Sequence, residues 1–189
     1  ENPTVIDYSS AQIDMVGRFG YRAYFGDATR PDMLHAAGID EAKLLIIAIG
    51  GKDRITEMTR YVCQTHPHVH VIACALDRTH VYDLYAAGCR DIIRETYDSS
   101  LRIGRSAYEA LGATRDQAER MKDVFDEMDR RVVLEMAEHH DPDVHASENE
   151  AFVSMVREMA GVWQGELETK FKEILSETPD TKTGSEDPA

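Results

Sequence analysis

The sequence predicts an α/β fold of the Rossmann-like, doubly wound type, in which a parallel sheet is followed by an all-helical C-terminal arm. Short apolar runs alternate with segments of helical length between residues 4 and 93, a pattern typical of parallel strands joined by crossover helices. The run Leu44–Ile49 is entirely apolar and rich in β-branched residues, and we expect it to form a central strand buried on both faces. From residue 98 onward the patterns are helical only.

The alternating part predicts strands and helices in regular succession. Strands are expected at Thr4–Asp7, Arg22–Phe25, Leu44–Ile49, His70–Ala75 and Asp91–Ile93. Helices are expected at Ala11–Phe19, Pro31–Ala37, Asp53–Gln64 and Asp77–Ala87. Helix N-termini are predicted at residue types that cap them, namely Ser9, Asp53 and Asp77, and glycines that end helices follow at Gly20, Gly38 and Gly88.

The second part of the chain predicts a helical arm. Helices are expected at Ser99–Leu111, from Thr114 (with Gln117 as a capping box) to His139, and at Ser147–Leu175. Apolar residues on the long helix form a stripe that suits a core or a dimer: Ala118, Met121, Val124, Phe125, Met128 and Val132. We therefore expect an α/β domain at 1–97, a helical arm at 98–140 that could pack in a core or in a dimer, a C-terminal helix at 141–175 and a disordered tail at 176–189.

Charge is spread unevenly along the chain, which has a formal net charge of −14. Residues 1–113 contain 15 acidic and 12 basic side chains, whereas residues 114–189 contain 20 and 9. This acidic second part argues against nucleic acid as a partner and suits a solvated arm or a basic partner protein. No apolar run reaches the length of a membrane span, and the three cysteines lack metal-ligand spacing, which indicates a reducing compartment.

Two aspartates follow apolar runs and are candidate nucleotide ligands. Asp7 ends the run Thr4–Asp7, and Asp27 follows Ala23-Tyr24-Phe25-Gly26. Ligands of open α/β sheets bind at the carboxyl ends of strands, where an Asp can bind the ribose hydroxyls. Taken singly, each aspartate could instead cap a surface helix. No GxGxxG motif occurs, so we expect a fragment of a longer protein that lacks the first strand and its glycine-rich loop.

Three stretches together resemble a known family. They are Val5-Ile6-Asp7 with the helix that follows, the segment Tyr24-Phe25-Gly26-Asp27-Ala28-Thr29-Arg30-Pro31-Asp32-Met33-Leu34, and Arg94-Glu95-Thr96-Tyr97 through Gly104-Arg105, Ala107 and Leu111-Gly112. Over residues 4–139 the chain resembles the RCK domain, also called KTN or TrkA-N, of Kef-type, glutathione-regulated potassium efflux systems. The last stretch resembles Kef-type proteins more than other RCK domains.

The resemblance implies a non-enzymatic regulatory domain that gates a cation/proton antiporter. AMP or NAD(H) is the implied nucleotide, with Asp7 at the ribose, Asp27, Ala28 and Thr29 at the adenosine, and Ala48 with the turn after it near the phosphates. The implied partners are a second copy in a homodimer, the membrane antiporter domain of the same full-length chain, and a flavodoxin-like ancillary subunit. The implied location is the cytoplasmic face of the inner membrane.

The sequence does not decide whether this chain binds glutathione, the ligand of the glutathione-gated members. In those members arginines stand where this chain has Cys74 and Leu76, and an asparagine stands where it has Asp129. Arginine binds carboxylates through paired hydrogen bonds that leucine and a thiol cannot make. Arg78 is the nearby cation that could replace them. Cys74 could sense electrophiles directly or serve only as a buried strand thiol.

Other functions are compatible with single features of the sequence. A stand-alone regulator of potassium uptake and an NAD-dependent oxidoreductase would use the same fold. His66, His68 and His70 alternate and would share one face of a strand, but Pro67 interrupts them and the sequence shows no fourth ligand nearby. We therefore predict no metal site and no catalytic residues.

Overall fold

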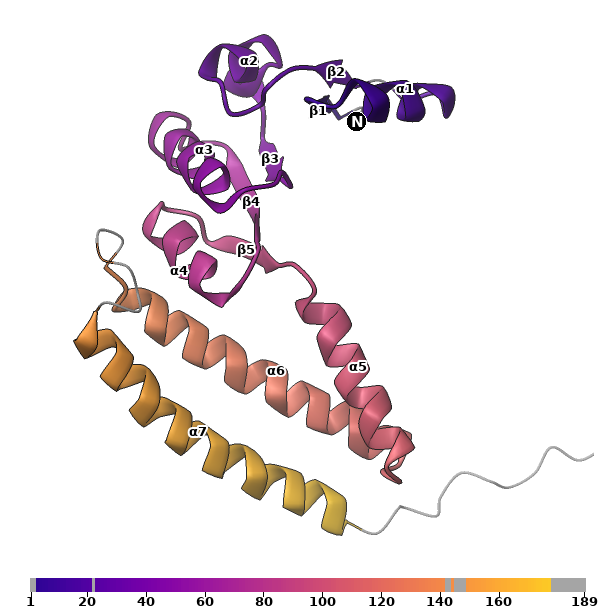
Figure 1. Cartoon of the computed structure of the whole chain (residues 1–189), viewed down its shortest axis with the longest axis vertical. Helices are drawn as coiled ribbons and strands as arrows, with labels where there is room; N and C mark the ends of the chain where they lie inside the picture. The colour runs from indigo at the N-terminus through magenta and orange to yellow at the C-terminus, as the bar shows by residue number, and fades with distance from the viewer. Residues whose placement is uncertain (1–2, 22, 142–143, 145–148, 178–189) are drawn as a thin grey trace, which may run out of the picture. The chain divides into compact units, whose positions relative to one another are not determined.

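The computed structural model describes residues 3–21, 23–141, 144 and 149–177. It divides into two compact units, residues 1–94 and residues 95–189, and each is described by itself. Figure 1 shows that, among the described residues, the strands lie in the first unit and the second unit is formed by long helices. The α/β class with a helical C-terminal part is therefore confirmed.

The first unit begins with a two-stranded parallel sheet. Its elements are β1 (Ile6–Asp7), α1 (Ser10–Arg18), β2 (Tyr24–Phe25), α2 (Pro31–Ala36) and the 3-10 helix η1 (Ile39–Glu41). In the ladder Ile6 pairs with Tyr24 and Asp7 with Phe25. Ser9 caps α1 as predicted, because its side chain accepts a hydrogen bond from the Gln12 amide.

A second parallel sheet follows in the order β3-β4-β5. Its elements are β3 (Leu44–Ile47), α3 (Lys52–Thr65), β4 (His70–Ala75), α4 (Arg78–Ala86) and β5 (Asp91–Arg94). Helices α3 and α4 pack on β4, and the core lies between them and the sheet. Its fully buried members include Ile47, Ala73 and Ala75 from the strands and Ile55, Val62 and Leu84 from the helices.

The prediction that Leu44–Ile49 is a central strand buried on both faces is wrong. The strand ends at Ile47, and the side chains of Leu44 and Ile46 are 48% and 60% exposed. Successive side chains of a strand point to opposite faces, so Ile46 lies on the face opposite Ile47, which packs under the helices. Among the described residues β3 pairs with β4 alone, which leaves its other edge open.

The predicted helix caps are partly confirmed. Asp77 caps α4 by accepting the His80 amide hydrogen, but the prediction that Asp53 caps α3 is wrong. Gly51, with a φ of 93°, is the N-cap, and the helix begins at Lys52. A glycine reaches this φ without strain, so the helix starts one residue before Asp53. The Asp53 side chain lies in the first turn, where a negative charge suits the helix dipole.

His80 is a fully buried histidine that joins α4 to the rest of the first unit. Its Nδ1 accepts a hydrogen bond of 3.1 Å from the Leu76 amide, and its Nε2 lies 3.1 Å from Thr56 Oγ1. Since Nδ1 is an acceptor, the proton of the neutral ring is on Nε2, which donates to the threonine. Burial lowers the pKa of His80, with the charges of Asp83 and Asp77 opposing that effect.

This buried histidine predicts that the protein loses stability as the pH falls. The unfolded imidazole binds a proton near pH 6.5 and the folded ring does so only at lower pH, so stability is complete above about 6.5 and decreases below it, by at most about 1.4 kcal/mol per pH unit. Urea unfolding at a series of pH values between 8 and 5 gives the free energy of unfolding at each pH. This free energy should decrease less steeply with falling pH in His80→Gln than in the wild type. An equal pH dependence of the two proteins would contradict the prediction. If the variant does not fold, nitrogen NMR of the His80 ring in the wild type tests the lowered pKa directly.

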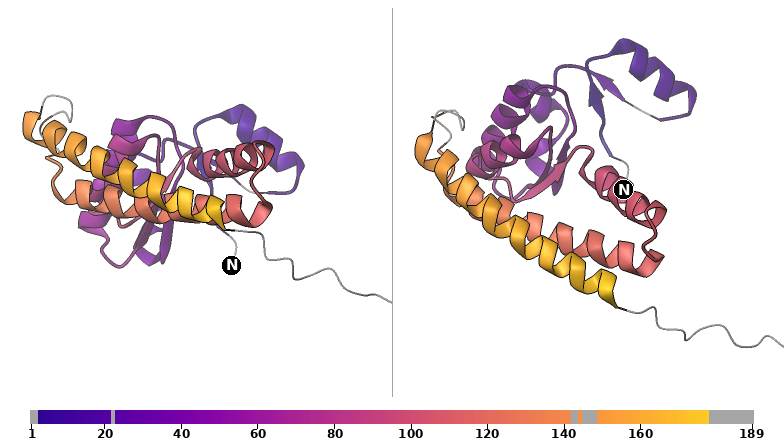
Figure 2. Two further views of the ribbon diagram at one scale, coloured as in Figure 1. Left: turned by 90° about the horizontal axis from the view of Figure 1, so that it is seen from below. Right: turned by 60° about the horizontal axis from the view of Figure 1, so that its bottom comes forward.

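The described residues of the second unit form the helices α5 (Tyr97–Ala110), α6 (Arg115–Glu138) and α7 (Glu150–Ser176). The predicted capping box of Thr114 and Gln117 is confirmed at the start of α6. Figures 1 and 2 show α6 and α7 side by side and running in opposite directions. The predicted apolar stripe contributes to this packing, since the Phe125 ring lies 5.4 Å from the Trp163 ring.

The predicted start of the last helix at Ser147 and most of the predicted tail lie outside the described residues. Within the described part of the chain, no helix combines the length and the apolar character needed to cross a membrane.

Candidate functional site

The carboxyl ends of β1 and β2 bring the two predicted aspartates to the same edge of one sheet. Asp7 is the last residue of β1, and Asp27 follows β2 after Gly26, whose amide donates to the Asp7 carbonyl oxygen at 3.0 Å. Both carboxylates are half-buried. The strands are parallel and paired, so the juxtaposition expected from the sequence is present.

Neither aspartate is a helix N-cap, so that alternative is wrong. The N-caps of α1 and α2 are Ser9 and Arg30. Asp7 Oδ1 accepts the Ser9 amide at 2.7 Å, and Asp27 Oδ1 accepts the Thr29 amide at 3.1 Å and the Thr29 hydroxyl at 2.8 Å. Each carboxylate thus shapes the turn that leaves its strand, as aspartates do in Asx-turns.

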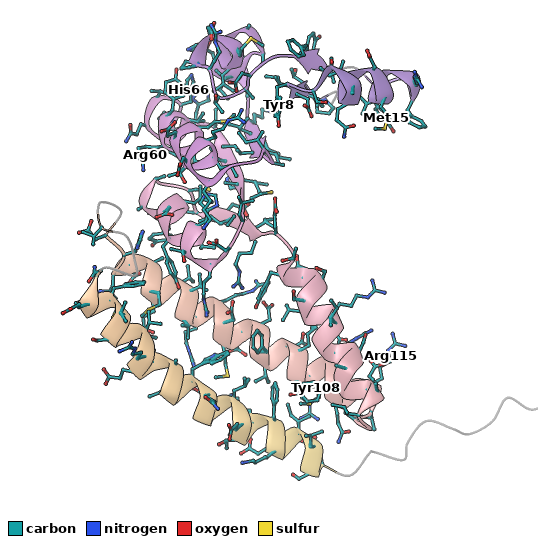
Figure 3. All side chains as sticks on the ribbon, in the orientation of Figure 1. Tyr8, Met15, Arg60, His66, Tyr108 and Arg115 are labelled. Carbon is teal, nitrogen blue, oxygen red and sulfur yellow. The ribbon has the colours of Figure 1, made fainter. Side chains whose placement is uncertain are left out.

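Arg54 is a member of this site that the sequence interpretation missed. From the first turn of α3, its Nη2 donates to Asp27 Oδ1 at 3.0 Å, and its guanidinium lies 5.5 Å from the centre of the Tyr8 ring. Figure 3 labels Tyr8 in the turn after β1. The position of Arg54 just after Gly50-Gly51, at the start of a helix that follows a strand, could have indicated it.

The charge state of Asp27 follows from these contacts. The Thr29 hydroxyl and amide, and then Arg54, lower the pKa of the Asp27 carboxyl, while partial desolvation opposes them. Asp27 is therefore a carboxylate at neutral pH, which is the form that accepts hydrogen bonds from ligand hydroxyl or amino groups.

The turn after β3 adds a second group of polar atoms. Ala48 directly follows β3 and is exposed, and Gly51 is the N-cap of α3, whose first amides have no helical acceptors. Lys52 forms an ion pair with Asp77, the N-cap of α4. The starts of α3 and α4 are thereby held next to each other beyond the ends of β3 and β4. The N-terminus of α3 has no side-chain cap, and such an N-terminus favours anions.

The three residues that the family resemblance assigns to a glutathione-like ligand fall in different units. Cys74 is half-buried in β4, and Arg78 is exposed at the first position of α4. Asp129 belongs to α6 of the second unit and is only 3% exposed. The structure therefore places Cys74 and Arg78 on either side of one strand-to-helix turn and describes Asp129 separately from them.

The three alternating histidines do not share a strand face, and the interruption at Pro67 noted in the sequence is the reason. Strand β4 begins at His70, so His66 and His68 precede it, because Pro67 occupies the turn between α3 and β4. His70 pairs with Asp91 at 2.9 Å across the β4–β5 ladder. His66 is buried instead, beside His35 and Asp40.

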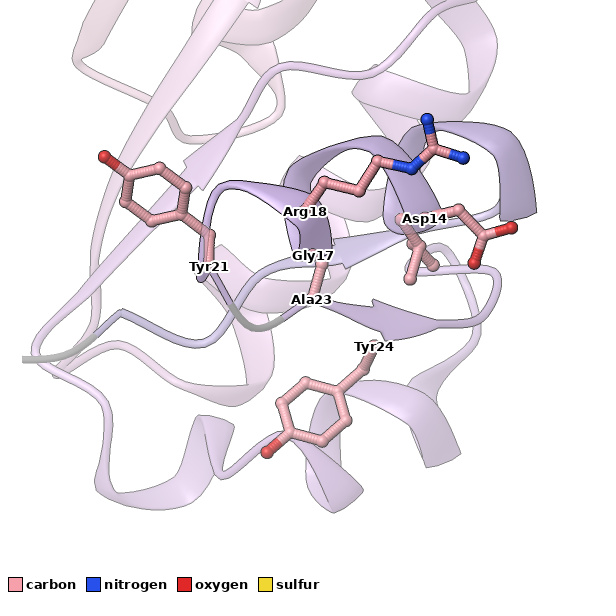
Figure 4. Close-up of a pocket in the computed structure, with 7 residues that line it drawn as sticks. Asp14, Gly17, Arg18, Tyr21, Ala23 and Tyr24 are labelled. Carbon is pink, nitrogen blue, oxygen red and sulfur yellow. The ribbon is translucent and has the colours of Figure 1, made fainter.

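Figure 4 shows an open hollow on the first unit whose lining includes neither Asp7 nor Asp27. It is formed by α1 and by the segment that leads into β2, and its lining residues are Ile13, Asp14, Gly17, Arg18, Tyr21, Ala23 and Tyr24. Because it is not formed at the carboxyl ends of the strands, we do not assign the nucleotide to it.

Comparison with known proteins agrees with the two-part organisation. Residues 1–95 match the family model of the TrkA-N domain, and residues 99–176 match that of the potassium efflux system KefB C-terminal domain. The glutathione-regulated potassium-efflux system proteins KefC of Salmonella typhimurium and Salmonella agona are 32% identical to 94% of this chain. The chain spans 31% of the length of these relatives.

Solved structures extend the comparison to the fold. The Kef CTD of Shewanella denitrificans, in AMP-bound form, is 35% identical with a TM-score of 0.66, over 72% of this chain and 84% of that one. The NAD(P)-binding domain of an exopolyphosphatase-related protein from Archaeoglobus fulgidus has a TM-score of 0.50 at 11% identity, over 58% of this chain and 81% of that one, and shows the fold alone. This chain belongs to the TrkA-N domain family, and its second part is homologous to the C-terminal region of the Kef potassium efflux proteins.

Proposed function

We propose that this chain is the nucleotide-binding regulatory part of a Kef-type potassium efflux system. The observation that carries the proposal is the pair of half-buried carboxylates, Asp7 and Asp27, at adjoining ends of two paired parallel strands. The AMP-bound form of the Shewanella denitrificans Kef CTD, which is 35% identical, supports an adenine nucleotide as the ligand.

The hydrogen bonds of the two aspartates leave room for such a ligand. Ser9 contacts Oδ1 of Asp7, and Thr29 and Arg54 contact Oδ1 of Asp27. The Oδ2 atom of each carboxylate is then available as an acceptor, for the ribose hydroxyls at Asp7 and for the adenosine at Asp27, Ala28 and Thr29. The phosphates of AMP or NAD(H) would lie toward Ala48 and the start of α3, where free amides favour anions.

In the full-length protein we propose that nucleotide binding shifts an equilibrium between closed and open states of a potassium/proton antiporter domain in the same chain. A ligand changes such an equilibrium only by its difference in affinity for the two states. We further propose a homodimer at the cytoplasmic face of the membrane, a flavodoxin-like ancillary subunit as a partner, and no enzymatic turnover of the nucleotide.

Glutathione is the less supported ligand of this chain. Arginine side chains bind carboxylates such as the two of glutathione through paired hydrogen bonds. The region around the β4–α4 turn contains one arginine, Arg78, together with Cys74 and Leu76. We therefore propose gating by nucleotide, with glutathione or its electrophile adducts as a second ligand only if Arg78 binds them.

The test is calorimetric titration of AMP, NADH and glutathione into the full chain and into Asp7→Ala. We expect saturable AMP or NADH binding that the variant weakens by about tenfold or more, because a hydrogen bond to a carboxylate contributes about 1.5–3 kcal/mol. NADH absorbance should stay constant during the titration, and its loss would instead indicate an oxidoreductase.

Asp14→Ala is the matched control, because Asp14 lines the hollow on α1 rather than the strand ends. Its nucleotide affinity should equal that of the wild type. Equal affinity of the Asp7→Ala variant and the wild type, or a selective loss in Asp14→Ala, would contradict the proposed site.

A further inference from the structure

Two histidines and one aspartate of the first unit converge around a single carboxylate. His35 Nδ1 lies 2.9 Å from Asp40 Oδ2, and His66 Nε2 lies 3.2 Å from Asp40 Oδ1. One donor atom from each of the three side chains lies within 4.8 Å of the others. None of these residues belongs to the nucleotide site, so the cluster is a separate feature.

The local backbone explains why residues so far apart in sequence meet. Helix α2 carries His35 in its last turn and ends at Gly38, whose φ of 92° reverses the chain into η1. Asp40 in η1 thereby faces back toward His35. His66 follows the last turn of α3, and Figure 3 shows it labelled beside α2 and α3. His68 Nε2 lies 2.9 Å from the Asp40 carbonyl oxygen and connects η1 to the turn after α3.

The hydrogen bonds of Thr65 fix the tautomer of the buried His66 ring. The Thr65 hydroxyl donates its one hydrogen to the Tyr61 carbonyl oxygen at 2.7 Å, and the same oxygen lies 2.7 Å from His66 Nδ1. Nδ1 must therefore carry a hydrogen and donate it to Thr65. In the neutral ring the lone pair is then on Nε2, which faces the Asp40 carboxylate. Two electron pairs facing each other at 3.2 Å require a cation between them.

His35 resembles His66 in that one ring nitrogen faces Asp40 and the other has a hydrogen-bond partner. The second nitrogen of His35, Nε2, lies 3.4 Å from the Tyr61 hydroxyl, which can accept its hydrogen when Nδ1 binds a cation. Histidine ligands of metals regularly donate their other ring N–H to a fixed acceptor in this way.

We propose that His35 Nδ1, the Asp40 carboxylate and His66 Nε2 bind one divalent transition-metal ion of the Zn²⁺ class, with water in the remaining positions. Two imidazoles and a carboxylate are ligands that Zn²⁺ accepts, whereas Ca²⁺ and Mg²⁺ prefer oxygen alone. Bonds of about 2.1 Å in a tetrahedral site require donor separations near 3.4 Å. The exposed His35 side chain can close the remaining distance by rotation about its side-chain bonds.

The test is titration of Zn²⁺, and of Co²⁺ as a visible probe, into the full chain in a buffer that does not coordinate metals. We expect one ion per chain, the absorption bands of tetrahedral Co²⁺, and a rise of the melting temperature with Zn²⁺ concentration, since a ligand of the folded state stabilises it. His35→Gln and Asp40→Asn should each lower the affinity by at least about tenfold. Both residues are exposed, so these variants should fold even where His66→Gln does not.

His70→Gln is the matched control, because His70 also pairs with an aspartate, at 2.9 Å from Asp91, but lacks a second histidine in that pair. It should bind Zn²⁺ like the wild type. Absence of saturable binding, or an equal loss in His70→Gln, would overturn the metal site and leave a proton as the cation between His66 and Asp40. AMP titration of the same variants separates this result from a failure of the nucleotide site.

Discussion

Replacing Asp27 by alanine should weaken AMP binding by about ten- to a hundredfold, the largest effect that we expect from a single side chain of the nucleotide site. The variant removes the acceptor of the Thr29 amide, the Thr29 hydroxyl and Arg54 together. It therefore changes both the turn after β2 and the link to α3. Calorimetric titration of AMP into the full chain measures the effect.

Two further variants separate the contribution of Asp27 to charge from its contribution to shape. Asp27→Asn keeps an oxygen for the Thr29 amide but removes the charge that faces Arg54, so its affinity should lie between those of the wild type and of Asp27→Ala. Asp32→Ala removes an exposed acid whose partner is Arg30 and should leave AMP affinity unchanged. An Asp27→Ala protein with wild-type affinity would show that AMP does not bind at this strand end.

Leu84→Ala should lower the free energy of unfolding of the first unit by about 2–5 kcal/mol, the range for a buried leucine truncated to alanine. The Leu84 side chain is 0% exposed on α4, and α4 packs on both β4 and β5. The variant loses the free energy gained by burying the removed carbon atoms. It also loses the van der Waals contacts that the residues around the resulting cavity made with those atoms. Urea unfolding followed by far-ultraviolet circular dichroism measures it.

Leu134→Ala is the control, because the same chemical change is made at a residue 57% exposed on α6; it should alter stability by no more than about 0.5 kcal/mol. Trp163 in α7, the only tryptophan of the chain, reports on the second unit through its fluorescence. If Leu84→Ala shifts the circular dichroism transition but not the fluorescence transition, the two units unfold separately. Equal stabilities of Leu84→Ala and the wild type would contradict the assigned core.

Several structural elements were predictable because they depend on local chemistry. The caps at Ser9, Asp77 and Thr114 are hydrogen bonds between a side chain and the amide three residues away, so residue type and position suffice to predict them. The alternation of apolar runs and helical segments likewise predicted the parallel strands and the crossover helices. The positions of Asp7 and Asp27 at adjoining strand ends were predictable for the same reason, and their role as nucleotide ligands stays a prediction based on the coincidence of strand ends and ligand sites in this fold class.

The errors occurred where a residue's surroundings come from distant segments. An apolar run at Leu44–Ile49 cannot reveal which of its faces a helix will cover, and the structure leaves Ile46 60% exposed. Gly51 displaced Asp53 as the cap of α3 because a backbone with positive φ starts the helix earlier. The sequence thus correctly indicated a strand at the first position and a helix start at the second. It did not indicate which strand face would be covered or which residue would be the N-cap.

The sequence by itself determined the fold class, the order of its elements and the two aspartates at adjoining strand ends, because these follow from periodicity and short-range hydrogen bonding. Only the tertiary structure decided that Arg54 contacts Asp27 and that His35, Asp40 and His66 share one site. Such contacts join residues 26 and 27 positions apart. They depend on where the two ends of α3 lie relative to the turn after β2 and to η1, and no local pattern encodes that placement.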